Sequence, residues 1–280
     1  MLRVAVPNKG ILSDAAISMF KEAGYAVRRD SQELHLVDDE NQIEFFYLRP
    51  RDIATYVGSG SLDVGLTGFD LLQDSESEAE EIADLGFGQS TFRFAAPKES
   101  GMSSAKDLQG KRLATAYPKL IENYLKAQGI SAHIVKLDGA VESAVKLGVA
   151  DAVADVVSTG NTLRKAGLSV FGPVILSSTA RLISAPGKAN LAEKLLRRLQ
   201  GVIVAREYVI FDYDCPKQLV EKATAVTPGI ESPTISPLAD DGWVAVRALV
   251  KASETNQVMD QLYELGARAI LVSAIHAARI

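Results

Sequence analysis

The sequence has one cysteine and three histidines, and each scarcity excludes a kind of site. Cys215 has no second cysteine with which to form an internal disulfide, and scattered histidines give no zinc-ligand cluster. We interpret Cys215 as structural, because no basic partner that would activate its thiol lies near it in the sequence. His35, His133 and His276 are each better explained as exposed or hydrogen-bonded residues than as a general base.

Excess positive charge and long apolar runs are lacking as well. A net charge of −5 argues against a nucleic-acid partner, whose binding would rest on a basic face. No run approaches membrane-spanning length, and the N-terminus enters a strand without a signal-peptide pattern, so we expect a cytoplasmic protein with no membrane partner. A complete dinucleotide fingerprint, a Walker loop and a nucleophile elbow are also missing.

The 280 residues are 47% hydrophobic, enough for two or three compact units. Strand patterns alternate with helix patterns, which predicts an α/β fold with a mainly parallel sheet. The acidic run 75–81 is interpreted as a solvated loop. The early strands are expected over Leu2–Val6, Glu33–Val37, Ile43–Leu48, Asp63–Leu66, Phe92–Ala96 and Arg181–Ala185, and the helices over Ser13–Ala23, from Pro118, and from Asn190 to about Arg206.

The most informative segment runs from Asp151 to Leu163. A short valine-rich strand leads into a loop of small and hydroxyl-bearing residues before a helix, and such a turn can hold a phosphate. Gly160 permits close backbone approach, and Ser158, Thr159 and Thr162 add donors. Asp155 suits sugar hydroxyls or a metal, and Asp151 would share its face of the strand about 13 Å away. An ordinary strand–turn–helix with Thr159 or Asn161 as N-cap is the alternative.

This loop resembles the phosphoribosyl pyrophosphate (PRPP) loop of the ATP phosphoribosyltransferase family. Further segments resemble that family in its order along nearly the whole chain, and the last of them belongs to its long form. These segments are Val4–Gly10, Leu48–Asp52, Asp63–Asp70, Arg112–Pro118, Leu195–Glu207 and Ser232–Leu238.

The resemblance implies a bilobal, periplasmic-binding-protein-like catalytic core with a C-terminal ferredoxin-like (ACT-like) regulatory domain. Lobe I would comprise residues 1–89 with 180–206, lobe II residues 90–179, and the regulatory domain residues 207–280. In the last of these, the βαββαβ order of elements is itself typical of a ferredoxin-like fold. That domain is either a histidine sensor or an oligomerisation module, and fold alone does not decide between them.

The implied reaction joins N1 of the adenine of ATP to C1 of the ribose of PRPP and releases pyrophosphate, the first step of histidine biosynthesis. Lys9, Arg49 and Asp155 are the catalytic candidates, although Lys9 and Arg49 could instead be surface residues. Asp70 and Tyr117, with Lys9 and Arg49, are candidates for the nucleotide. The PRPP loop would comprise Asp151, Asp155, Ser158, Thr159, Gly160, Asn161, Thr162 and Leu163.

The resemblance also implies partners and regulation. Mg²⁺ would be carried largely by the substrates' phosphates, AMP would compete for the nucleotide site, and the protein would form a homo-oligomer, a dimer and a hexamer. Histidine would be a feedback inhibitor. Its site would comprise Asp214, Ile230, Ser232, Thr234 and Ala269, of which Ile230 and Ala269 could equally be core residues. Two alternatives remain: a bilobal binding or sensor protein without catalysis, and a catalytic subunit that depends on a companion.

Overall fold

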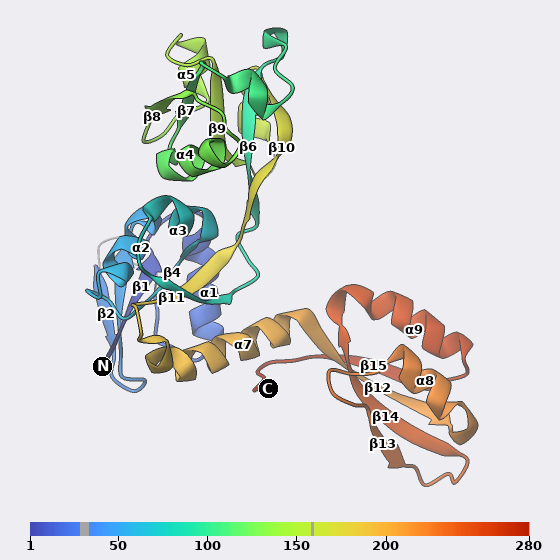
Figure 1. The fold of residues 1–280 in the computed structure, drawn as a ribbon. Coiled ribbons are helices and arrows are strands. Elements are labelled where there is room, and N and C mark those ends of the chain that lie inside the picture. The colour runs from blue at the N-terminus through green and yellow to red at the C-terminus, as the bar shows by residue number, and fades with distance from the viewer. Residues whose placement is uncertain (29–33, 158–159, 280) are drawn as a thin grey trace. The chain divides into compact units, whose positions relative to one another are not determined.

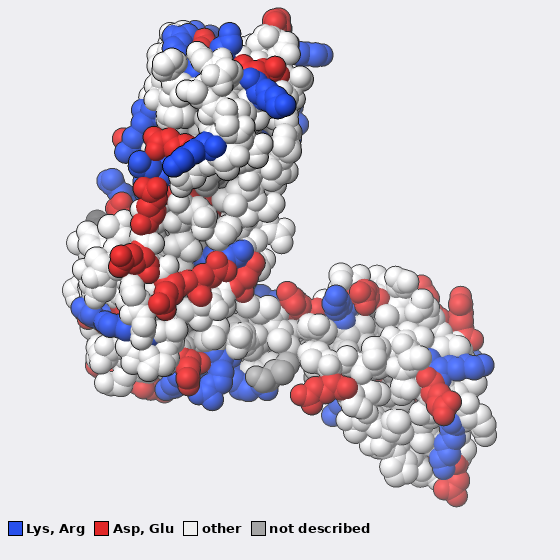
Figure 2. Space-filling model, in the orientation of Figure 1, with Lys and Arg blue, Asp and Glu red and all other residues white. Residues whose placement is uncertain are grey.

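The computed structural model describes residues 1–28, 34–157 and 160–279. Contacts divide the chain into two compact units, Met1–Glu193 and Lys194–Ile280. The first unit holds two sheets and the second holds one (Figure 1). Within the described residues, no helix combines the length and the apolar character that crossing a bilayer requires. Basic and acidic side chains are mixed on the face of each unit drawn in Figure 2.

The first sheet has the order β2-β3-β1-β4-β11-β5. Its strands are β1 (Leu2–Pro7), β2 (His35–Asp38), β3 (Ile43–Leu48), β4 (Val64–Gly68), β5 (Glu80–Asp84) and β11 (Ala180–Ser184). The central strands β3, β1 and β4 are parallel. Each leads into a helix: β1 into α1 (Ile11–Glu22), β3 into α2 (Pro50–Gly58) and β4 into α3 (Phe69–Ser75). Residues 4–6 of β1 are fully buried, as expected for a central strand covered on both faces.

The second sheet has the order β10-β6-β9-β7-β8. Its strands are β6 (Ser90–Pro97), β7 (Arg112–Thr115), β8 (His133–Lys136), β9 (Ala152–Val157) and β10 (Leu168–Ser178), and the helices are α4 (Pro118–Ala127), α5 (Ser143–Lys146) and α6 (Asn161–Lys165), with short 3₁₀ turns over Lys98–Ser100 and Ala105–Leu108. Pro118 is the first residue of α4, as its fixed φ predicts. Phe92 and Phe94 of β6 are buried in one core with Leu120 and Ile121 of α4.

The two segments that join the sheets are β6 and β10, which pair with each other in antiparallel fashion from Ser178–Ser90 to Leu168–Pro97. β10 then leads directly into β11 of the first sheet. The prediction of a mainly parallel sheet is therefore wrong in part. The first sheet is parallel only among β3, β1 and β4, and the second only among β9, β7 and β8, because the joining strands return without a crossover helix and pair in antiparallel fashion. The predicted loop 75–81 ends in β5, where Glu81 forms an ion pair with Arg181.

The first unit ends after a 3₁₀ turn over Ala189–Ala192, and α7 (Glu193–Glu207) leads into the second unit. The further elements are β12 (Tyr208–Pro216), a 3₁₀ turn over Lys217–Leu219, α8 (Val220–Val226), β13 (Thr234–Pro237), β14 (Trp243–Lys251), a 3₁₀ turn over Ala252–Glu254, α9 (Thr255–Glu264) and β15 (Arg268–Ala274). The βαββαβ order is confirmed, and the sheet order β13-β14-β12-β15 is antiparallel throughout. Contacts group α7 with this unit, whereas the predicted boundary placed it in lobe I.

The C-terminal tail of the second unit crosses α7 at Gly201. A Cβ at this position would overlap the carbonyl group of Ala278 and approach the guanidinium of Arg279 to 2.9 Å. Gly201 is thus required for close approach of the tail, since any other residue would displace it. On the other side of the domain, α8 and α9 cover one face of the sheet, where Phe211, Tyr213 and Val246 are buried.

Candidate functional site

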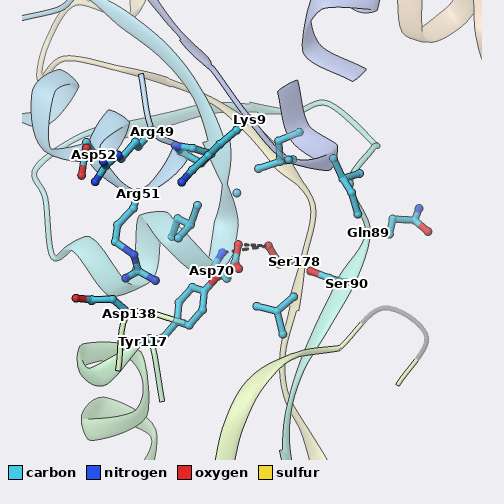
Figure 3. A pocket seen from close by; sticks show the side chains of 18 residues that line it. Lys9, Arg49, Arg51, Asp52, Asp70, Gln89, Ser90, Tyr117, Asp138 and Ser178 are labelled. Atoms are coloured by element: carbon cyan, nitrogen blue, oxygen red, sulfur yellow. Dashed lines mark hydrogen bonds between the residues drawn. The ribbon is translucent and has the colours of Figure 1, made fainter. Parts of the chain in front are cut away.

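A cavity of about 720 Å³ lies at the carboxyl ends of the central strands of the first sheet (Figure 3). Lys9 follows β1, Arg49 follows β3, and Asp70 follows β4 in the first turn of α3. Because these strands are parallel neighbours, their carboxyl ends meet at one edge and the three side chains converge there. The structure brings together Lys9, Arg49, Asp70 and Tyr117, which all line this cavity.

Six polar residues that the sequence did not single out line the same cavity: Arg51, Asp52, Gln89, Ser90, Asp138 and Ser178. Arg51 lies inside the segment Leu48–Asp52, where its spacing from Arg49 was a usable signal. Ser90 and Ser178 lie at the paired ends of the two joining strands. No local pattern marks them, because their proximity depends on how the chain passes twice between the sheets.

Asp70 and Ser178 form a buried reciprocal pair (Figure 3). The Ser178 hydroxyl donates to Asp70 Oδ1 at 2.8 Å and accepts from the Asp70 backbone N–H at 3.0 Å. Both residues are at most 6% exposed. A hydrogen bond to a buried carboxylate is among the stronger kinds. The pair therefore fixes the start of α3 to the end of β10 at the floor of the cavity.

Tyr117 presents its ring and hydroxyl to the cavity in a fixed orientation. The Phe92 ring packs edge-on at 5.0 Å, and the Arg51 guanidinium lies 4.7 Å from the Tyr117 ring centroid. Burial raises the pKa of the Tyr117 hydroxyl far above its ordinary value, and the negative charge of Asp70 adds to the rise. Tyr117 is therefore a neutral hydrogen-bonding group at physiological pH.

Asp155 is a half-buried carboxyl on β9 whose pKa is raised to about 6. The main cause is burial, and the charges of Glu142 and Asp70 add to it, whereas the Val156 N–H at 2.8 Å and the charge of Arg51 oppose it. Hydrogen-bond donors or a cation that approach such a carboxyl would stabilise its ionised form. Within the described residues, no three His, Cys, Asp or Glu side chains are grouped to hold a metal.

Comparison with known proteins identifies the family. Residues 49–201 match the family model described as ATP phosphoribosyltransferase, and residues 205–277 match the HisG C-terminal domain. The chain is 63% identical to the ATP phosphoribosyltransferase of Pseudarthrobacter chlorophenolicus and 56% identical to that of Streptomyces coelicolor, and each comparison covers both chains completely. The chain belongs to the ATP phosphoribosyltransferase family. Its function is accordingly the first step of histidine biosynthesis.

Solved structures agree with this assignment. The ATP phosphoribosyl transferase (HisG:HisZ) complex from Thermotoga maritima matches with a TM-score of 0.63 and 28% identity over 72% of this chain and 98% of that chain. An arginine-bound protein, Tv2483, matches with a TM-score of 0.51 and 14% identity over 71% of this chain and 83% of that chain, which shows the fold alone. The bilobal, periplasmic-binding-protein-like core is therefore confirmed for this ATP phosphoribosyltransferase.

The loop after β9 is described in part. Ser158 and Thr159 lie outside the described residues. Gly160 has a φ of 70° and is the N-cap of α6, a position for which the sequence suggested Thr159 or Asn161. Asn161 opens the helix, and its side-chain oxygen accepts a hydrogen bond from Arg164. Because α6 has only five residues, its dipole is small.

Two residues predicted in the PRPP loop are occupied elsewhere. Asp151 precedes β9 at the end opposite the loop, where it pairs with the Arg112 guanidinium at 2.7 Å and accepts from the Arg112 backbone N–H at 2.9 Å. These bonds lower the pKa of Asp151 to about 2. Leu163 is 4% exposed and packs in the core with Val153 and Leu168, so its side chain anchors the start of α6 to the core. The expectation that Asp151 and Asp155 line one cleft is therefore not met.

The predicted histidine-site residues of this ATP phosphoribosyltransferase lie in the second unit. Asp214 on β12 and Thr234 on β13 are opposite Ala245 and Arg247 of β14, so they share the sheet face that α8 and α9 leave open. Ile230 is 39% exposed, and Ser232 is exposed in the same loop. Ala269 on β15 is exposed with a φ of 49°. Ile230 and Ala269 are thus surface residues, which removes the core alternative.

Proposed function

We propose that the cavity binds ATP and that the loop after β9 binds PRPP for the transfer. The observation that carries this proposal is the convergence of Lys9, Arg49 and Tyr117 on one cavity that Val156, next to Asp155, also lines. Lys9 and Arg49 supply positive charge for phosphates, and Tyr117 supplies a neutral surface and a hydroxyl. AMP shares the adenine and a phosphate with ATP, and we propose it as a competing ligand of the same cavity.

In the reaction we propose, the lone pair of adenine N1 attacks C1 of the ribose. The bond from C1 to the pyrophosphate oxygen breaks, and its electron pair leaves with the pyrophosphate. No proton must be removed before attack, so the reaction does not require a histidine as general base. Lys9 and Arg49 stabilise the phosphate charge that grows in the transition state, while Asp155 accepts hydrogen bonds from the ribose hydroxyls and orients the ring.

Mg²⁺ fits this arrangement as an ion that arrives on the substrates' phosphates. Since no cluster of three protein ligands exists within the described residues, we propose Asp155 as the protein's contribution to its coordination. When bound, the ion neutralises charge on the departing pyrophosphate. We place this chemistry in the cytoplasm, in a homo-oligomer whose expected forms are a dimer and a hexamer.

We further propose that the C-terminal domain binds histidine as a feedback inhibitor at Asp214, Ile230, Ser232, Thr234 and Ala269. The carboxylate of Asp214 would pair with the ligand's ammonium group on the open face of the sheet. Inhibition then requires that histidine bind two conformations of the protein with different affinity. The exposure of all five side chains, at least in part, supports their availability to a ligand.

The test is pyrophosphate release from ATP, PRPP and Mg²⁺. We expect Lys9→Ala and Arg49→Ala each to reduce kcat/KM by about 100-fold, the loss typical of a preorganised charged donor. Lys21→Ala is the matched control, since Lys21 is an exposed lysine at the end of α1 outside the cavity lining. Unchanged kinetics in both cavity variants would reject the assignment. Binding of both substrates by the wild type without pyrophosphate release would favour the non-catalytic alternative.

A further inference from the structure

α3, from the first lobe, and α4, from the second, contact each other directly (Figure 1). α4 begins at Pro118, and the N–H groups of its first turn have no partner inside the helix. The side chain of the N-cap residue, Tyr117, provides no capping bond. Instead, Oδ1 of Asp74 in α3 accepts from the backbone N–H groups of Lys119 at 2.9 Å and Leu120 at 3.1 Å. The cap of α4 therefore comes from the other lobe.

The second oxygen of the same carboxylate holds an arginine. Asp74 Oδ2 lies 2.9 Å from Nη1 of Arg51, which belongs to α2 of the first lobe. The Arg51 guanidinium lies in turn over the ring of Tyr117, the residue just before α4 (Figure 3). The Asp74 side chain is 8% exposed, so water solvates its carboxylate poorly and the hydrogen bonds from these partners must stabilise it instead.

We propose that Asp74 is a positioning residue of the transferase, which couples the approach of the two lobes to the geometry of the cavity. Asp74 is not among the residues that line the cavity, whereas Arg51 and Tyr117 are. With the lobes together, one carboxylate caps α4 and sets Arg51 against Tyr117. When the lobes separate, the two bonds to α4 break, while Arg51 keeps its bond to Asp74 because both belong to the first lobe.

The coupling has a direct consequence for substrate binding. A ligand that contacts both Arg49 and Tyr117 bridges the lobes, so its affinity depends on the population of the capped arrangement. Removing the carboxylate lowers that population and frees the Arg51 side chain. We therefore expect weaker binding per site rather than fewer sites. This inference rests on the proposed binding of ATP in the cavity.

The experiment is calorimetric titration of the full-length protein with ATP, together with steady-state kinetics. We expect Asp74→Ala to raise the Kd for ATP about tenfold, to lower kcat/KM by at least as much, and to leave the number of sites unchanged. Asp74→Asn keeps an oxygen that can cap α4 and loses the charge that holds Arg51, so its effect should be intermediate. Asn also serves if the Ala variant does not fold. Combining Asp74→Ala with Arg51→Ala should add little to the larger single effect.

Glu122→Ala is the matched control. Glu122 is an acid on α4 that is 47% exposed and pairs with Lys119 at 3.0 Å, so its removal alters the charge of the same helix without touching Asp74. Its Kd should equal that of the wild type. Unchanged affinity in both Asp74 variants, or a loss of sites at constant Kd, would overturn the inference. Failure of the wild type itself to bind ATP would instead reject the proposed occupant of the cavity.

Discussion

The raised pKa of Asp155 makes the stability of the folded protein depend on pH. Its ordinary pKa is 3.8, and burial raises it to about 6. Between these two values the folded protein binds more protons at this site than the unfolded chain, so stability falls as pH rises through that window. Above pH 6 the buried charge costs about 3 kcal/mol, since each pKa unit represents about 1.4 kcal/mol.

Asp155→Asn should therefore stabilise the ligand-free protein and impair the enzyme. At pH 8 we expect its melting temperature to lie several degrees above that of the wild type, with the difference disappearing below about pH 4. Activity should fall at least tenfold, because the amide presents donors to the donors of the ribose. Calorimetric melting across pH 3.5–8 measures the first effect. Equal melting temperatures at pH 8 would show that the carboxylate is compensated by partners in the fold.

Gly160 combines two requirements that substitution can separate. Its φ of 70° disfavours residues with a Cβ, and the proposed binding of PRPP by this loop also requires space for a phosphate. Gly160→Ala should cost about 1 kcal/mol of stability through backbone strain. Gly160→Asn should fold nearly as well as the wild type, because asparagine tolerates this conformation. Both should bind PRPP at least tenfold more weakly in a titration. Normal affinity in the Asn variant would mean that no phosphate approaches this backbone.

At the scale of elements, the local patterns predicted much of the first sheet and the whole order of the C-terminal domain. The strands expected over Glu33–Val37 and Ile43–Leu48 correspond to β2 and β3, although Glu33 lies outside the described residues. The backbone geometry of Pro118 gave the start of α4. β10 was missed, because the burial of its side chains follows no regular period. Asp151 was placed wrongly because strand alternation predicts only the face on which a residue lies. It does not predict the ion pair with Arg112, which is 39 residues away in the sequence.

Substitution of Gly201 tests whether the C-terminal tail packs on α7. In an ordinary helix interior, glycine to alanine stabilises by about 1 kcal/mol. Here the new Cβ would overlap the backbone at Ala278, so we expect Gly201→Ala to destabilise the full chain. In a chain ending at Ala274 the same substitution should stabilise. Urea unfolding of the four proteins measures both signs. Stabilisation in both backgrounds would show that the tail does not rest on α7.

At the scale of the whole molecule, the C-terminal domain is predicted to sense histidine. A chain ending before Tyr208 should keep ATP binding and lose inhibition by histidine, although truncation can also disturb assembly. Asp214→Asn is the cleaner variant, and we expect it to weaken histidine binding at least tenfold in calorimetric titration. Asp212→Asn is its control, because Asp212 lies on the same strand and face but is paired with Arg247 at 2.7 Å. Equal weakening in both variants would indicate a general charge effect.

The assignment of function arose from the whole chain rather than from any one pattern. The loop after β9 alone allowed an ordinary strand–turn–helix, and Lys9 and Arg49 were compatible with a surface location. Their convergence required the parallel order of β3, β1 and β4, which no single segment contains. Ser178 became visible only once the lobes were placed together, since its partner Asp70 is distant in sequence, whereas the spacing of Arg51 from Arg49 was a usable signal.

The lone thiol of Cys215 gives this molecule a built-in reporter. It is 1% exposed beneath α8 and α9 in the C-terminal domain, and burial raises its pKa, so it is shielded from alkylating reagents in the folded state. Cys215 is the single cysteine of the sequence, so no other thiol competes for the reagent. The rate at which the intact protein is alkylated therefore measures opening of the C-terminal domain alone. Added histidine should slow this labelling, without any engineered probe, if the domain closes around its effector.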